Sequence, residues 1–281
     1  MKNIALGQYY PAESLIHRLD PRAKVICAII YIVASFLCKN FFSFVFLVVS
    51  SVALILLSRI PVRVVMRSIR ALIFIMVFTA VLNIFWTKDK TAEPLVSFWV
   101  IDIYEKGLYN ALFIIVRIVS MVIGTSLFLT YTTTPIALTD AIEHLLRPLK
   151  KLKVPVHEFA MMMTIALRFI PTIVDETDKI MSAQKARGAD FSNGSLIDRV
   201  KALIPVIIPL FASSFRRAGE LATAMECRCY HGGDGRTRLK QLKYSPRDFL
   251  FMIFMLLLTV GGIVAINILG ERFGWVYTLS M

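Results

Sequence analysis

The stretch of sequence that decides the fold begins at Phe159 and ends at Tyr230, and it contains two long amphipathic segments. The first reads FAMMMTIALRFIPTIVDETDKIMSAQKARG (159–188), and the second reads VKALIPVIIPLFASSFRRAGELATAMECRCY (200–230). Each segment ends with an arginine between small side chains, in Ala186-Arg187-Gly188 and in Cys227-Arg228-Cys229. The sequence therefore predicts two long helices that present Arg187 and Arg228 at their far ends.

Apolar or small side chains recur about every 3.5 residues in both segments, which predicts two amphipathic helices. In the first segment these positions are Met163, Leu167, Ile170, Val174, Thr177 and Met181. In the second they are Val200, Ile204, Ile208, Phe211, Phe215, Ala218, Ala222 and Met225. We expect the two faces to pair or cross, with small residues such as Ser213 and Gly219 allowing the backbones to approach closely. Pro171 is expected to bend the first helix.

The chain as a whole is both apolar and basic. Of its 281 residues, 57% are hydrophobic, and the formal net charge is +13. Soluble domains are less apolar, and membrane proteins accumulate Lys and Arg in cytoplasmic loops, so this combination predicts an integral membrane protein in a lipid bilayer. Nucleic-acid-binding proteins are also basic, but five hydrophobic stretches argue against that class, and we expect no nucleic-acid partner.

These five stretches predict an all-α membrane protein with about five transmembrane helices. They are Val25–Cys38, Phe41–Leu57, Leu72–Trp86, Leu108–Tyr131 and Phe249–Leu269. The pair Asp20-Pro21 predicts a helix start just before the first of them. The expected organisation is a membrane part over residues 1–131 with four spans, a long-helix region over 132–248, and a C-terminal span and tail over 249–281.

The charges place the long-helix region in the cytoplasm. Residues 132–248 hold eighteen basic and twelve acidic side chains, whereas residues 87–107 hold three basic and four acidic ones. Because basic loops stay inside, we expect the N-terminus and the region 132–248 on the cytoplasmic side of the cell membrane. The segment 87–107 and the C-terminus should then lie outside.

Two further groups of arginines accompany the predicted spans. Arg59, Arg63, Arg67 and Arg70 follow one another in steps of four, four and three, which predicts one helical face resting on anionic headgroups. Arg117 falls inside the fourth span, where a charge is costly, so it should face protein. Backbone carbonyls could satisfy it, or it could mark a functional site, and both interpretations stay open.

The residues around Arg187 and Arg228 also allow two interpretations. A guanidinium without bulky neighbours can enter a groove of a partner and bind carboxylates in bidentate geometry. Alternatively, each arginine belongs to an ordinary basic last turn that the helix dipole favours. A metal site at Cys227, Cys229 and His231 is not expected, because helical residues two apart point about 200° away from each other.

Nothing in the sequence predicts an enzyme or a cofactor. The glycine-rich segment 231–236 lacks the Gly-Lys-Ser/Thr ending of a phosphate-binding loop and follows no strand. We therefore expect the chain not to hydrolyse ATP itself.

The chain resembles, over nearly its whole length, the transmembrane T component of energy-coupling factor transporters, a class of ABC importers. The resemblance rests on short motifs in a fixed order. They are Ser14 with His17 to Arg22 and Lys24, Arg117, Thr132 to Pro135, Leu167 to Pro171, Ala183-Gln184, Ala186 to Gly188, Pro205, Pro209, and Glu220 to Tyr230.

This resemblance implies a scaffold in which Arg187 and Arg228 dock into two ABC ATPase subunits. The second motif departs from the family pattern, because Cys227 and Cys229 stand where Ala or Gly is usual. The resemblance also implies a small substrate-binding membrane protein, the S component, which releases a vitamin or a transition-metal ion inside the cell. Met161, Met162, Met163, Phe211 and Phe215 are the residues we expect to contact it.

Other classes of protein compete with this interpretation. A conventional ABC permease would have one short coupling loop, whereas residues 132–248 contain two long helices. A channel or secondary transporter would carry several polar groups at the bilayer midplane, whereas Arg117 is nearly the only one in the predicted spans. The methionines and phenylalanines could also contact only the core or the bilayer, since Met packs adaptably in either place.

Overall fold

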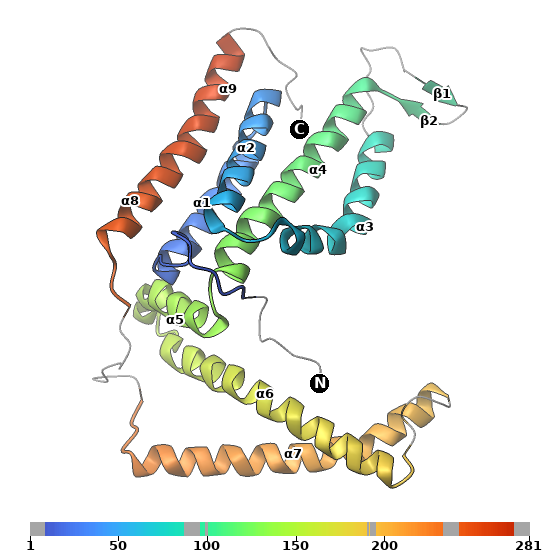
Figure 1. Cartoon of the computed structure of the whole chain (residues 1–281), viewed down its shortest axis with the longest axis vertical. Helices are drawn as coiled ribbons and strands as arrows, with labels where there is room; N and C mark the ends of the chain where they lie inside the picture. Colours follow the sequence, from blue (N-terminus) through green and yellow to red (C-terminus); the bar gives the residue numbers. More distant parts are fainter. Residues whose placement is uncertain are drawn as a thin grey trace. The chain divides into compact units, whose positions relative to one another are not determined.

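The computed structural model describes residues 9–86, 96–98, 101–189, 191, 195–232 and 242–272. The regular secondary structure of these residues is helical, apart from one short antiparallel hairpin between β1 (Val96–Phe98) and β2 (Ile101–Ile103) (Figure 1). The expectation of an all-α membrane protein is therefore confirmed, and the hairpin is a small addition to it. Most of the segment predicted to lie outside, 87–107, falls outside the described residues.

The described chain forms two compact units, with the boundary inside helix α5 (Pro135–Leu146). The bundle unit consists of residues 9–141 and 242–272, and the long-helix unit consists of residues 142–232. The division into 1–131, 132–248 and 249–281 stays a prediction.

The bundle unit is built from two N-terminal helices, two helices that flank the hairpin, and one long C-terminal helical segment. Its elements are α1 (Pro21–Leu37), α2 (Phe41–Ser58), α3 (Val62–Trp86), α4 (Glu105–Thr125) with the wider π turn η1 (Ser126–Tyr131), and α8 (Pro246–Met255), η3 (Leu256–Gly261) and α9 (Gly262–Arg272). As predicted, Asp20 caps α1: its side chain accepts a hydrogen bond from the backbone N–H of Arg22. The turn between α1 and α2 consists of Cys38, Lys39 and Asn40.

Helix α1 is the centre of the bundle unit, because α4, η1, α8 and η3 all pack against it. Tyr31 is fully buried there, and its hydroxyl pairs with Ser51 of α2 (Oη to Oγ 2.6 Å). Gly124 of α4 makes this packing possible, because a Cβ at that position would lie 2.2 Å from the Tyr31 ring. The hydroxyl is satisfied inside the core, as a buried tyrosine requires.

Among the described residues, five helices are long and apolar enough to cross a membrane, but one of them is not among the five that the sequence predicted. Four agree: Phe41–Ser58, Val62–Trp86, Glu105–Tyr131 and Pro246–Gly270. The predicted first span corresponds to α1, whose 17 residues reach only about 25 Å. The fifth candidate is instead Val156–Ala186, with a mean hydropathy of 1.2 against 2.1 to 2.8 for the others. Helix α1 tolerates its polar first turn because Arg22 and Lys24 are buried against neighbouring parts of the chain, while Ile29, Val33 and Phe36 form an exposed apolar face.

The C-terminal end of α1 is capped by side chains from two distant helices. Arg117 of α4 donates from Nη2 to the carbonyl oxygen of Cys38 (2.9 Å), and Asn267 of α9 donates to that of Leu37 (2.7 Å). The last carbonyls of a helix have no partner within it, and lipid offers none. The first interpretation of Arg117 is therefore confirmed: a backbone carbonyl oxygen at the C-terminus of a helix binds its charge.

The long-helix unit contains the C-terminal part of α5, the 3-10 helix η2 (Arg147–Leu152), and the two helices α6 (Val156–Ala186) and α7 (Leu196–Cys227). With 31 and 32 residues, α6 and α7 are each about 46 to 48 Å long. Figure 1 shows α6 as a nearly straight helix although Pro171 lies inside it, so the expected bend is absent. Helix α7 changes direction in its N-terminal part, which contains Pro205 and Pro209.

Candidate functional site

The two long helices end in the same backbone structure. After α6, the N–H of Gly188 bonds to the carbonyl of Lys185 and the N–H of Ala189 to that of Gln184, both at 3.0 Å. After α7, the N–H of Cys229 bonds to Glu226 (2.8 Å) and the N–H of Tyr230 to Met225 (3.1 Å). Both pairs define a Schellman motif, the commonest way in which a helix satisfies its last carbonyls. Arg187 and Arg228 occupy the same C-cap position in the two motifs.

The residue after each arginine has a left-handed backbone conformation. Gly188 has φ +88° and Cys229 has φ +53°. Glycine adopts such angles freely, whereas a side chain at this position costs about 1 kcal/mol or more. The residue that follows each arginine therefore makes the left-handed turn that ends the helix. Gly188 makes this turn without strain, whereas Cys229 makes it at a cost in free energy.

All six residues of the two motifs are exposed: Ala186, Arg187, Gly188, Cys227, Arg228 and Cys229. Neither Arg187 nor Arg228 forms an ion pair within the described residues, so both guanidinium groups are available to a partner. Both cysteines are free thiols. His231 donates from Nδ1 to the carbonyl of Cys229 (2.8 Å), and the described residues contain no metal-binding group of three or more His, Cys, Asp or Glu.

Helices α6 and α7 contact each other through a polar bridge that the sequence pattern did not predict. Glu176 of α6 accepts hydrogen bonds from Ser213 (2.5 Å) and Arg217 (2.6 Å) of α7. Gln184 donates to the carbonyl of Pro205 (3.4 Å), so the two helices run in opposite directions where they meet. The Glu176 side chain is only partly exposed as a result.

The pairing face of α7 is also not the predicted one. Its buried residues are Val206 and Ser213, and the half-buried residues on the same face are Leu210, Arg217 and Leu221. The predicted apolar face, with Ile204, Ile208 and the stacked rings of Phe211 and Phe215, is exposed instead. Small Ser213 lets α6 approach closely, which the phenylalanines would prevent, so the expectation about small residues is confirmed at Ser213.

The residues expected to contact an S component lie mostly on the surface. Met162 and Met163 are each 52% exposed, Phe211 is 61% exposed and Phe215 is 74% exposed, whereas Met161 is half-buried. Large apolar side chains exposed together on a helix indicate contact with another protein or with lipid.

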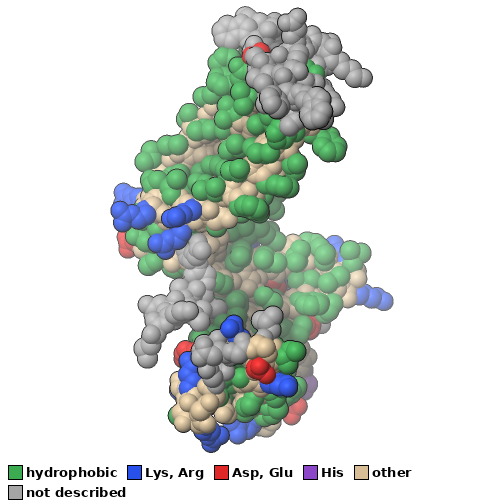
Figure 2. Space-filling view, turned by 90° about the vertical axis from the view of Figure 1, so that its right-hand side faces the viewer, with side chains coloured by type: hydrophobic (Ala, Val, Ile, Leu, Met, Phe, Trp, Pro, Cys, Tyr) green, Lys and Arg blue, Asp and Glu red, His purple; other side chains and the backbone are tan. Residues whose placement is uncertain are grey.

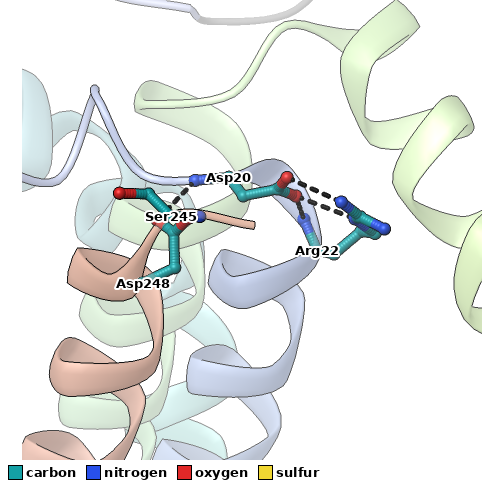
Figure 3. Close-up of polar contacts among 4 residues, drawn as sticks. All are labelled: Asp20, Arg22, Ser245 and Asp248. Atoms are coloured by element: carbon teal, nitrogen blue, oxygen red, sulfur yellow. Dashed lines mark hydrogen bonds and ion pairs between the residues drawn. The ribbon is translucent and has the colours of Figure 1, made fainter. Parts of the chain in front are cut away.

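Near the start of the chain, the motif Asp20-Pro21-Arg22 forms a clasp with the start of the last helix. The Asp248 carboxylate accepts the backbone N–H of Asp20 (3.0 Å) and that of Ser245 (2.7 Å) (Figure 3). On its other side, Asp20 binds the Arg22 guanidinium through both oxygens (3.1 and 3.0 Å), and this guanidinium lies over the Tyr244 ring. The sequence motif was visible, but its partners are more than 220 positions away.

The segment before this clasp is fixed to the end of α4 and η1. Lys24 is buried, and its ammonium donates to the carbonyls of Thr132 (2.7 Å) and His17 (3.2 Å). His17 donates from Nε2 to the carbonyl of Tyr10 (3.0 Å) and accepts from Ser14 at Nδ1 (2.7 Å). Burial lowers the pKa of His17, which favours the neutral ring that this bonding requires. These motif residues therefore have structural roles.

The apolar bundle, with helices that require a bilayer to cover them, defines a multi-pass membrane protein, and comparison with known proteins defines its class as a transporter component. Residues 12–239 match the CbiQ family, described as cobalt transport protein. The chain is 51% identical to the energy-coupling factor transporter transmembrane protein EcfT of Clostridium kluyveri, over 98% of this chain and 99% of that protein. It is 47% identical to EcfT of Thermosediminibacter oceani (98% and 100% covered) and 44% identical to EcfT of Bacillus subtilis (92% and 96%).

The chain therefore belongs to the CbiQ/EcfT family, the transmembrane components of energy-coupling factor transporters. This confirms the resemblance found in the sequence. The alternative of a conventional ABC permease is not supported.

Proposed function

We propose that this chain couples two ATPase subunits to a substrate-binding S component through Arg187 and Arg228. The observation that carries the proposal is the repetition of one helix end: two Schellman motifs, each with an exposed arginine at the C-cap. A basic last turn alone would not require the same residue at the same position of the same motif twice. Two matching ends suit two equivalent surfaces, as a pair of related ATPase subunits would provide.

Each arginine would enter a groove of one ATPase and bind a carboxylate there. A guanidinium presents its donors in a fixed planar arrangement, so it can bind a carboxylate through two hydrogen bonds in one orientation. A lysine ammonium fixes the orientation less well. ATP would be hydrolysed by the partner subunits, and this chain would need no cofactor. Movement of the ATPases would then displace the far ends of α6 and α7.

The exposed apolar residues of α6 and α7 would contact the S component. Met162, Met163, Phe211 and Phe215 offer adaptable and aromatic side chains on the same two helices that end in the arginines. Motion of the helices would thereby reach the subunit that binds the cargo, a vitamin or a transition-metal ion. The N-terminus and both long helices would lie in the cytoplasm and the C-terminus outside, because the basic loops favour that orientation.

The decisive experiment reverses both charges, in the double variant Arg187→Glu/Arg228→Glu. We expect membrane insertion to persist, while uptake and the transport-coupled ATPase activity of the complex fall at least a hundredfold, because each glutamate would meet a carboxylate. The control Arg168→Glu/Arg216→Glu changes the same charge at exposed positions within the same helices and should retain activity. Normal uptake by the double variant would contradict the proposal.

A second experiment tests the S-component surface with a photo-crosslinker in place of Met162. Capture of a small membrane protein is expected from the native membrane, and none from a matched crosslinker at Asp178, which is exposed on α6 but not apolar. If Met162 captures only lipid, the methionines contact the bilayer and this part of the proposal is wrong.

A further inference from the structure

The first turns of α3 carry a row of exposed arginines. Arg63, Arg67 and Arg70 lie on α3 within an arc of about 60°, and all three are exposed. Arg59, which the sequence placed in the same row, precedes the helix: it is the C-cap of α2, with φ +54°. The row therefore consists of three arginines over about 10 Å of helix.

The opposite side of these turns is fixed to the bundle unit. Val65 is buried, as is Ile60 just before the helix. The hydroxyl of Tyr131, at the end of η1, donates to the carbonyl of Val64 (3.2 Å) and pairs with the hydroxyl of Ser68. The row is thus presented on a rigid support with its guanidinium groups directed away from the packed side.

Apolar side chains surround the row on its exposed side. Val62 and Met66 are exposed beside the arginines, and Phe74, Val77 and Phe78 are exposed in the following turns, Phe74 by 80%. Figure 1 shows the first turns of α3 crossing the end of the bundle at a steep angle to the rest of the helix. In Figure 2, Lys and Arg side chains gather at an edge of a broad hydrophobic surface. Such a change from arginine to exposed phenylalanine is typical of the level where headgroups meet acyl chains.

No acidic residue lies between Arg59 and Trp86, and within the described residues none of the three arginines forms an ion pair. Among the described residues, no acidic side chain compensates these three positive charges beside a membrane-crossing helix. We infer that Arg63, Arg67 and Arg70 bind the phosphates of anionic phospholipid headgroups and fix the level of α3 in the bilayer. The ligand is a lipid rather than a soluble phosphate, because the exposed Met66 and Phe74 next to the arginines can contact the acyl chains of the same lipid.

The size of the effect follows from the charge. One basic residue near an anionic membrane surface strengthens binding about fivefold, so three should contribute roughly a hundredfold. Lysine would retain most of this, because it keeps the charge, although it loses the bidentate contact with phosphate.

The test titrates the detergent-solubilised full-length chain with phosphatidylglycerol and with phosphatidylcholine, and counts bound lipid by native mass spectrometry. We expect the wild-type chain to prefer phosphatidylglycerol, and Arg63→Gln/Arg67→Gln/Arg70→Gln to bind it about a hundredfold more weakly. The charge-matched control Arg168→Gln/Arg199→Gln/Arg216→Gln should stay within a few-fold of the wild-type chain. The triple Lys variant should retain most of the preference.

Four results would overturn the inference. The first three are unchanged phosphatidylglycerol binding in the Gln variant, an equal loss of both lipids, and displacement of the lipid by glycerol phosphate at similar concentration, which would indicate a soluble-anion site. Loss of a co-purified subunit with unchanged lipid binding would assign the row to a protein partner and also overturn it. If the triple Gln variant does not fold, Arg67→Gln alone carries the test, with an expected loss of about fivefold.

Discussion

The bundle unit and the long-helix unit satisfy their polar and apolar groups in different ways. In the bundle unit, helix ends are capped by side chains from distant helices, as Arg117 and Asn267 cap α1 and Asp248 binds the backbone before it. In the long-helix unit, α6 and α7 meet at the Glu176 bridge and at the Gln184–Pro205 hydrogen bond, and most large apolar side chains of α7 stay exposed. The bundle unit therefore satisfies most of its polar groups internally, whereas the long-helix unit leaves apolar side chains and two C-cap arginines exposed.

This difference indicates where stability and where function are concentrated. A buried carboxylate that accepts two backbone N–H groups stabilises the fold strongly, because its removal leaves donors without partners. An exposed arginine at a helix end contributes little to stability but remains free to bind a partner. Changes in the bundle unit should therefore affect folding, and changes in the long-helix unit should affect coupling.

The largest effect on stability is expected for Asp248→Ala. The substitution removes the acceptor of the Asp20 and Ser245 N–H groups at a site that is 3% exposed, which should cost about 3 kcal/mol. Thermal unfolding of the detergent-solubilised protein measures it. Asp175→Ala, at an exposed position of α6, is the control and should change the midpoint little. Equal effects of the two substitutions would show that the clasp does not stabilise the bundle unit.

A smaller and more local effect is expected for Glu176→Gln. The amide retains an acceptor for Ser213 but loses the charge that binds Arg217, so the α6–α7 contact should weaken by about 1 kcal/mol. Hydrogen exchange should speed up at the amides of α6 and α7 near the bridge and stay unchanged in α1. Asp178→Gln removes a neighbouring exposed charge and should have no such effect. Faster exchange in α1 as well would mean that the two units do not respond independently to a substitution.

The smallest effects are expected at the two helix ends, where they should have opposite signs. Gly188→Ala places a side chain at φ +88° and should destabilise the end of α6 by about 1 kcal/mol, whereas Cys229→Gly should relieve a similar cost. Gly219→Ala is the control, because Gly219 lies inside α7 with open space around it, and there alanine should stabilise the helix. Exchange rates of the amides of residues 188–189 and 229–230 measure the change. Equal responses at both ends would contradict the assigned strain at Cys229.

Much of the fold could be predicted from local patterns. The lengths of the hydrophobic stretches predicted four of the five candidate spans, and Asp20-Pro21 predicted the start of α1. Both features depend only on residues that are close in the sequence. By length and hydropathy the fifth candidate span is α6 rather than the 17-residue α1, although the charge pattern predicts that α6 lies in the cytoplasm. The start of α1 can be polar because Arg22 and Lys24 are buried against residues far along the chain, and this depends on its neighbours.

The pairing face of α7 shows the same limit of local patterns. The sequence assigned the most apolar face to the contact with α6, but the contact forms on the face with Ser213 and Arg217. Spacing identifies faces and does not say which face meets which partner, because close approach favours small residues over bulky ones. The exposed Phe211 and Phe215 are then available to a partner outside the chain.

The sequence by itself determined that this is a basic, helical membrane protein with two long helices, each ending in an arginine between small residues. It did so because hydropathy, charge and periodicity are properties of neighbouring residues. Only the tertiary structure decided that both arginines occupy the C-cap of the same motif, that Cys229 replaces glycine in a left-handed turn, and that Asp248 holds the start of α1. Gly188 is a local signal of such a helix end, but Cys229 carries no such signal, and the contact of Asp248 joins residues far apart in the chain, where no local pattern reaches.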